Sequence, residues 1–366
     1  MKIEGRSYRT IWTSADNAHV YVVDQTRLPF ALEVVELRTV ADAERAIRTM
    51  IVRGAPLIGA TAAYGMALAV REDASDKSLT DNVKFLRAAR PTAVNLAWAV
   101  EDMASHLRSI PVSQRVESAF VRAAAICDAD VAQCESIGTH GAALIRRLAS
   151  EKKRTVNILT HCNAGWLACV DWGTALAPIY KAHNEGISVH VWVDETRPRN
   201  QGAFLTAYEL GAHGVPHTVI ADNLGGHLMR EGRVDMAIVG SDRTCINGDV
   251  CNKVGTYLKA LAAHDNGVPF YVALPSTTID WQMRSGNEIP IEERDAREMT
   301  HISGITADGR FETVRVVPEK SPAFNLGFDV TPAKYVTGLI MERGICEANR
   351  EGLLKLFPER RQEAAE

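Results

Sequence analysis

Polar residues that could carry chemistry follow three apolar runs of the chain. Cys162 follows the run 156–161, the segment 194–201 follows the run 188–193, and Asp242 follows the run 236–240. A carboxylate just beyond an apolar strand is partly desolvated, which raises its pKa towards proton transfer near neutrality. Asp242 is therefore the leading candidate for a general acid or base, and a turn-capping or Arg243-paired carboxylate is the alternative.

Cys162 is the candidate reactive thiol. Most free cysteines are small buried apolar residues, and that remains the alternative here. The position of Cys162 at a strand end, beside Asn163 and before an expected helix N-terminus, instead favours an activated thiol.

A phosphate site is predicted where the chain enters helices. Arg53 and Gly54 precede an expected helix whose first amides are free to bind an anion. The same argument applies to Arg90 and Lys253, which we also expect at helix starts, although a single basic residue is more often a solvated surface charge. Amide side chains are suited to sugar hydroxyls or to helix caps. The candidate binding residues are Arg53, Gly54, Ala55, Arg90, Gln201, Asn252 and Lys253.

The elements that must position these residues alternate in the C-terminal part. Short apolar runs at 156–161, 188–193, 217–221, 236–240 and 270–274 alternate with helical patterns at 202–213 and 253–267. This order predicts an α/β fold with a doubly wound, Rossmann-like and mainly parallel sheet, whose ligands lie beyond the carboxyl ends of the strands.

Two domains are expected. Residues 1–150 contain two short strands within 8–23 and then mostly helical spacing, and residues 151–366 form the α/β catalytic domain. The segment from residue 333 onward is expected to close the chain with helices and a charged tail.

Composition and missing motifs exclude several classes of protein. The 366 residues carry a net charge of -4 and seven cysteines, which favours neither nucleic acid nor membrane and argues for a reducing cytoplasm. The N-terminus lacks the pattern of a secretory signal, and no apolar run is long enough to span a membrane. No dinucleotide-binding glycine motif, P-loop, CxxC, HExxH or GxSxG is present, so a dehydrogenase, a Walker NTPase and a tight zinc site are not supported.

Several blocks in a fixed order resemble the methylthioribose-1-phosphate isomerase family. They are RGAPLIGATAAYG (53–65), RPTAVNLAWA (90–99), THCNAGWLA (160–168), VDETRPRNQGAFLTAYEL (193–210), the stretch 240–280, IPIEER (289–294) and FDVTPAKYVTGLI (328–340). By this resemblance Asp242 is the proton donor, Cys162 is the catalytic cysteine, and the seven binding candidates contact the substrate. The resemblance also implies a homodimer, no metal or organic cofactor, and a role in methionine salvage.

The reaction implied is conversion of 5-methylthioribose 1-phosphate into 5-methylthioribulose 1-phosphate. Isomerases of 5-deoxyribose 1-phosphate or ribose 1,5-bisphosphate, and a non-catalytic regulatory protein of the same fold, are the alternatives. Departures from the common family pattern at Trp166, Cys169, Asn200 and Phe204 leave the five-position substituent open between methylthio, methyl and phosphate. Regulatory relatives typically lack the cysteine–aspartate pair, whereas Cys162 and Asp242 are both present.

Overall fold

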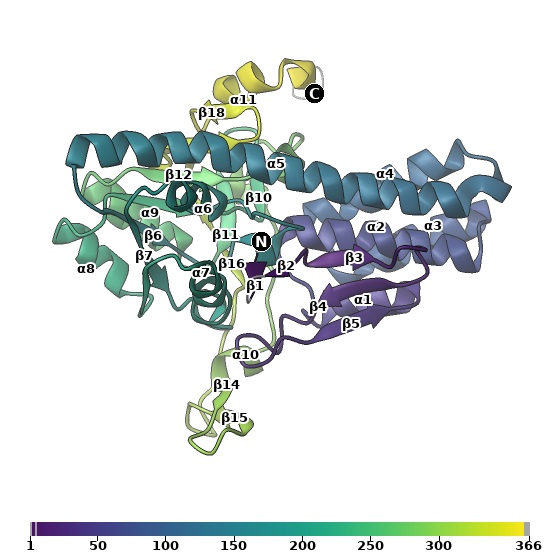
Figure 1. Ribbon diagram of the computed structural model, residues 1–366, viewed down its shortest axis with the longest axis horizontal. Coiled ribbons are helices and arrows are strands. Elements are labelled where there is room, and N and C mark those ends of the chain that lie inside the picture. The colour runs from purple at the N-terminus through teal and green to yellow at the C-terminus, as the bar shows by residue number, and fades with distance from the viewer. Residues whose placement is uncertain (1, 4–5, 362–366) are drawn as a thin grey trace.

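The computed structural model describes residues 2–3 and 6–361, and its N-terminal part combines small antiparallel sheets with a helical cluster (Figure 1). Strands β1 (Lys2–Ile3) and β2 (Arg6–Ser7) pair with each other, and β3 (Ile11–Thr13), β4 (Val20–Val23) and β5 (Val34–Leu37) form a three-stranded sheet. Four helices follow: α1 (Val40–Arg48), α2 (Ala55–Glu72), α3 (Asp76–Ala89) and α4 (Val94–Arg108). The predicted strands within 8–23 are confirmed, and β5 was not predicted.

Helix α2 lies at the centre of this helical cluster. Its alanine-rich sequence is buried on nearly all sides, and it packs against α1, α3 and α4. Pro56 suits the first turn because proline lacks an amide hydrogen, and the amide hydrogens of a first turn have no acceptor within the helix. Gly54 caps the helix with a positive φ of 91°. The helix start therefore lies where the sequence predicted it, directly after Arg53.

Helix α5 (Arg115–Lys152) runs along the whole molecule (Figure 1). Ala119, Phe120 and Ala123 pack in the core of the helical cluster, whereas Ile137 and Ile145 pack in the core against the large sheet. The helix thus continues past residue 150, and the domain division expected there stays a prediction.

The large sheet has the strand order β18-β17-β12-β9-β6-β7-β8. The strands are β6 (Val156–Thr160), β7 (Val189–Asp194), β8 (His217–Ile220), β9 (Met236–Val239), β12 (Phe270–Ala273), β17 (Gly338–Met341) and β18 (Gly344–Cys346). All neighbours pair in parallel except β17 and β18. Helices α6 (Ala177–Asn184), α7 (Ala207–His213), α8 (Leu224–Arg230) and α9 (Thr256–Asp265) connect them, and the π-helical turn Gly202–Thr206 leads into α7. The predicted α/β fold is confirmed.

The closing segment differs from the prediction. Instead of helices alone, it supplies β17 and β18 to the sheet before α11 (Arg350–Leu356). A four-residue apolar run such as Gly338–Met341 has no periodicity that distinguishes a buried strand from a helix, so the strand had no clear signal.

A second, smaller sheet has the order β13-β10-β11-β16, from Ile279–Asp280, Arg243–Cys245, Val250–Lys253 and Phe328–Thr331. After α10 (Arg297–Thr300), the hairpin of β14 (His301–Ile305) and β15 (Phe311–Arg315) projects from the body (Figure 1). No helix among the described residues is both long and apolar enough to cross a membrane.

Candidate active site

A small cavity of about 30 Å³ lies where the carboxyl ends of β6 and β9 meet the start of α2. Six of the nine predicted site residues line it: Arg53, Gly54, Ala55, Cys162, Asp242 and Asn252. Their segments are far apart in the sequence, so the fold brings together what the strand-end argument predicted. The remaining candidates, Gln201, Lys253 and Arg90, lie near this cavity.

Cys162 is held in a strained backbone conformation at the end of β6. Its φ is 65°, in the left-handed region that side-chain-bearing residues rarely adopt. Two hydroxyls fix it there: the Thr196 Oγ1 accepts from the Cys162 amide at 2.8 Å, and the Thr206 Oγ1 donates to the Cys162 carbonyl at 2.7 Å. The thiol donates to Gln201 Oε1 at 3.0 Å. The chain then enters a short 3₁₀ turn (Trp166–Ala168) rather than the α-helix that was expected.

The charge state of the Cys162 thiol is set by burial and by its neighbours. Burial raises the pKa of Cys162, and the Asp242 carboxylate raises it further, whereas Arg53 and Lys253 lower it. The net effect is a thiol held neutral in the resting site, in agreement with its hydrogen bond to Gln201.

Asp242 lies between β9 and β10, with its amide donating to the Cys251 carbonyl at 2.9 Å. Burial raises the pKa of its carboxyl, and the cations Lys253, Arg90 and Arg53 offset part of that rise. Arg243 does not pair with it; that guanidinium lies 3.6 Å from Asp280 and donates to the Thr92 carbonyl. Asp242 is therefore a cavity-lining carboxyl that keeps its proton to a higher pH than an exposed aspartate does.

Arg53 is buried, and its guanidinium donates two hydrogen bonds to a single residue, Asn163. Its Nη2 donates to the Asn163 carbonyl at 2.7 Å, and its Nη1 donates to the Asn163 side chain. Its Nε is buried without a hydrogen-bond partner. At Gly54 a Cβ would lie 2.5 Å from the Ala168 backbone, so only glycine allows this close approach.

Lys253 and Asn252 occupy the end of β11. Lys253 was expected at a helix start, but α9 begins only at Thr256. Its Nζ donates to the Gly327 carbonyl at 2.7 Å and lies 4.6 Å from the centre of the Phe328 ring. Burial lowers the pKa of Lys253, while the nearby Cys162 and Asp242 raise it. A buried cation thus lies near the candidate thiol and acid.

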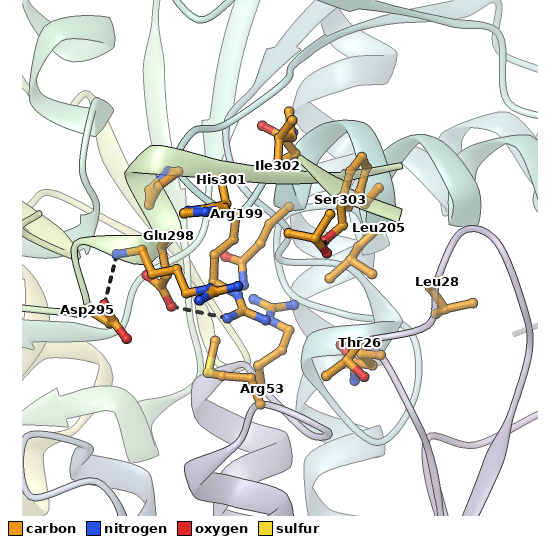
Figure 2. A pocket seen from close by; sticks show the side chains of 18 residues that line it. Thr26, Leu28, Arg53, Arg199, Leu205, Asp295, Glu298, His301, Ile302 and Ser303 are labelled. Atoms are coloured by element: carbon orange, nitrogen blue, oxygen red, sulfur yellow. Dashed lines mark hydrogen bonds and ion pairs between the residues drawn. The ribbon is translucent and has the colours of Figure 1, made fainter. Parts of the chain in front are cut away.

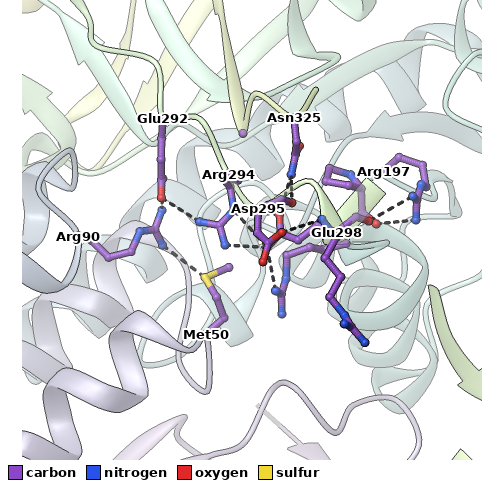
Figure 3. A network of polar contacts seen from close by, with 12 residues as sticks. Met50, Arg90, Arg197, Glu292, Arg294, Asp295, Glu298 and Asn325 are labelled. Atoms are coloured by element: carbon purple, nitrogen blue, oxygen red, sulfur yellow. Dashed lines mark hydrogen bonds and ion pairs between the residues drawn. The ribbon is translucent and has the colours of Figure 1, made fainter. Parts of the chain in front are cut away.

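Arg90 is also not at a helix start. It follows α3 as its C-cap residue, and α4 begins at Val94, so Pro91 ends one helix rather than opening the next. The Arg90 Nη2 lies 3.1 Å from the Glu292 carboxylate (Figure 3), and its Nε is buried without a partner. Arg90 is not among the residues that line the small cavity.

Glu292 belongs to a chain of ion pairs that extends from the loop before α10 into that helix (Figure 3). It lies 2.9 Å from Arg294, which in turn pairs with Glu298 at 2.8 Å. Although burial raises the pKa of Glu298, Arg294 and Arg199 lower it to about 2. Sequence reasoning did not single out Glu292, Arg294 or Glu298; the block IPIEER was noted only for its resemblance.

A larger cavity of about 380 Å³ adjoins the small one at Arg53, which lines both (Figure 2). Gln201, the partner of the Cys162 thiol, also lines it. Its walls combine apolar side chains with charged ones from the segment after β7, from α10 and from the residue pair just before α10. The apolar group includes Leu28, Met50, Phe204, Leu205 and Ile302, and the charged group includes Arg199, Asp295, Arg297 and Glu298.

Two groups of buried or half-buried donors have the composition of metal ligands within the described part of the chain. One is Asp130 with Cys134 and Cys169, of which Cys169 also lines the small cavity. In the other, which is built around Asp194, the ammonium of Lys259 lies 3.2 Å from the carboxylate and supplies the positive charge. Neither group includes a predicted site residue.

Comparisons with known proteins agree with this architecture. The chain matches the model of the initiation factor 2 subunit family over residues 51–348. It is 64% identical over 365 residues to a methylthioribose-1-phosphate isomerase of Methylorubrum extorquens, with 100% of both chains covered. It is 58% identical over 366 residues to that of an Escherichia coli O45:K1 strain, covering 100% of this chain and 98% of the relative.

Two solved structures share the fold. The 5-methylthioribose 1-phosphate isomerase of Pyrococcus horikoshii OT3 superposes with a TM-score of 0.82 at 37% identity over 97% of each chain. The translation initiation factor eIF-2B subunit delta of A. fulgidus gives 0.78 at 36% identity over 96% of this chain and 100% of that one. At these identities over the full length the chain is an aldose–ketose isomerase, and it belongs to the methylthioribose-1-phosphate isomerase family within the wider initiation factor 2 subunit family.

Proposed function

We propose that this enzyme converts 5-methylthioribose 1-phosphate into 5-methylthioribulose 1-phosphate, with Asp242 as general acid and Cys162 as catalytic thiol. The observation that carries the proposal is that both residues line one cavity together with Arg53. The names of the full-length relatives support the choice of substrate. Methionine salvage, a cytoplasmic homodimer, and independence from nucleic acid and membrane are part of the same proposal.

Asp242 is suited to the first step. A phosphate on the anomeric oxygen prevents the sugar from opening to a free aldehyde, so the ring oxygen must be protonated as its bond to the anomeric carbon breaks. Burial raises the pKa of the Asp242 carboxyl, and a raised pKa favours retention of the proton that a general acid donates in this step. The cations Arg53 and Lys253, near the same cavity, would attract the phosphate.

The role of Cys162 follows from the second step, in which hydrogen moves from the second carbon to the first. In a phosphoenolate route the thiolate removes the proton from the second carbon, so the neutral thiol must first lose its own proton. In a hydride shift the thiol only stabilises the transition state. Reaction in D₂O distinguishes the two, because the phosphoenolate route introduces deuterium at the first carbon of the product and the hydride shift does not.

The substrate must extend beyond the small cavity. A space of about 30 Å³ accommodates roughly one water molecule, whereas ligand pockets usually measure about 300–1,000 Å³. The adjoining cavity of about 380 Å³ has the necessary size. With the reacting carbons between Cys162 and Asp242, we place the five-position substituent there, where Leu28, Phe204 and Leu205 offer apolar contacts to a methylthio group.

Steady-state kinetics on four substrates test the proposed function. The kcat/KM for 5-methylthioribose 1-phosphate should exceed those for 5-deoxyribose 1-phosphate, ribose 1-phosphate and ribose 1,5-bisphosphate. The bisphosphate is a necessary comparison because Arg297 also lines the larger cavity. A higher value for any of the other three would reassign the substrate. Lys253→Ala and Arg90→Ala should mainly raise KM, and an unchanged KM in both would contradict the proposed phosphate contacts.

A further inference from the structure

The carboxylate of Glu209 lies behind the candidate site and contacts none of the residues proposed to act on the substrate. It is 1% exposed, within α7. Its Oε1 accepts from Asn163 Nδ2, and its Oε2 accepts from the Trp166 amide and the Tyr180 hydroxyl, each at 2.8 Å. A Cβ at Gly165 would overlap the Glu209 carboxylate, so the carboxylate fits at this position only because residue 165 is a glycine.

Asn163 connects Glu209 to Arg53. The amide nitrogen of Asn163 faces Glu209 and the Thr206 Oγ1, the latter at 3.1 Å, which turns the amide oxygen towards the Arg53 guanidinium. An asparagine amide can flip with little change in shape, so its orientation depends on these neighbours. The Glu209 carboxylate accepts from the nitrogen of the Asn163 amide, and this contact therefore determines that the amide oxygen faces Arg53.

We propose that Glu209 is a positioning residue that, through Asn163, holds the Arg53 guanidinium in place for the phosphate of the substrate; this rests on the proposed phosphate-binding role of Arg53. The interposed amide has a chemical advantage. A carboxylate in direct contact would satisfy the guanidinium and compete with the phosphate, whereas an amide oxygen orients it without neutralising it. Burial raises the pKa of Glu209 to about 7, and Arg53 is among the groups that oppose this rise.

Glu209→Gln reverses the polarity of this connection while keeping its shape. The Trp166 amide is a fixed backbone donor, so the new side-chain nitrogen has to face Asn163. Asn163 must then flip, and its nitrogen meets Arg53 as donor against donor. We expect KM for the aldose 1-phosphate, and the Kd for inorganic phosphate by calorimetry, to rise about 10- to 100-fold, with kcat changed by less than about threefold.

A double-mutant cycle separates positioning from general damage. If Glu209 acts through Arg53, Glu209→Gln should change KM by less than about twofold in an Arg53→Ala background. Tyr180→Phe is the matched control, because it removes a contact to the same carboxylate without lying between Glu209 and Arg53. Equal effects of Glu209→Gln in both backgrounds, or no effect on KM and Kd, would overturn the proposal.

Two further measurements keep the test decisive. If Glu209→Gln does not fold, Glu209→Asp keeps the charge but withdraws the oxygen from Asn163, and it should raise the same constants in wild type but not beside Arg53→Ala. If the wild-type enzyme turned over no aldose 1-phosphate, the proposed function would fail while phosphate binding still tested Glu209. Absence of phosphate binding by the wild type would overturn the positioning role itself.

Discussion

Asp130→Asn should change the pH dependence of stability. Asp130 lies buried in α5, and its Oδ2 accepts from the Val170 amide at 2.7 Å. Burial raises the pKa of Asp130 from 3.8 to about 7. In the window between those values the folded protein keeps a proton that the unfolded chain has lost, so the free energy of unfolding falls as pH rises. Asparagine is neutral throughout and still offers an oxygen to Val170.

The magnitude follows from the same two values. A difference of about 3 pKa units at about 1.4 kcal/mol each gives about 4 kcal/mol. The free energy of unfolding of Asp130→Asn, minus that of wild type, should therefore grow by up to about 4 kcal/mol between about pH 4 and about pH 8. Urea denaturation followed by tryptophan fluorescence at a series of pH values measures this. Asp265→Asn, an exposed carboxylate in α9, serves as the control and should leave the slope unchanged. A difference that stays constant across the range would refute the reasoning.

Three further substitutions test the site. Asp242→Asn should abolish turnover and leave substrate affinity by calorimetry nearly unchanged, because the amide cannot supply the ring proton; wild-type-like activity would remove Asp242 from its role. Cys162→Ala should lower kcat by about 10²- to 10⁴-fold with a much smaller change in KM, and a pure loss of affinity would identify the thiol as a packing group. Gly165→Ala should lower Tm and raise KM because its Cβ displaces the Glu209 carboxylate. The control Gly304→Ala has no atom within 4 Å of the new Cβ and should change neither Tm nor KM. Equal behaviour of the two alanine variants would argue against the close contact at Gly165.

The sequence was most informative where strands end. Parallel strands are short apolar runs whose carboxyl ends meet at one edge, so the neighbourhood of Cys162 and Asp242 could be predicted from their positions alone. Helix boundaries were less certain. Arg90 was expected at a helix start, but α3 extends to Ala89 and leaves Arg90 between two helices.

The supporting contacts could not be predicted in the same way. Glu209 lies in a helical pattern, where a carboxylate is usually a solvated charge, and its partner Asn163 is 46 residues away. Glu292 contacts Arg90 across 202 residues. Contacts between residues so far apart in the sequence depend on how the elements pack, and the local pattern of apolar residues does not predict them.

Helix α5 has a mechanical consequence. An α-helix of 38 residues is about 57 Å long at about 1.5 Å per residue. Because this one continuous helix contributes apolar residues to the helical cluster at one end and to the large sheet at the other, unfolding of the helix would remove packing from both cores. Any movement of one core relative to the other has to bend or shift this helix, so its stiffness limits how far the start of α2 can separate from the ends of β6 and β9.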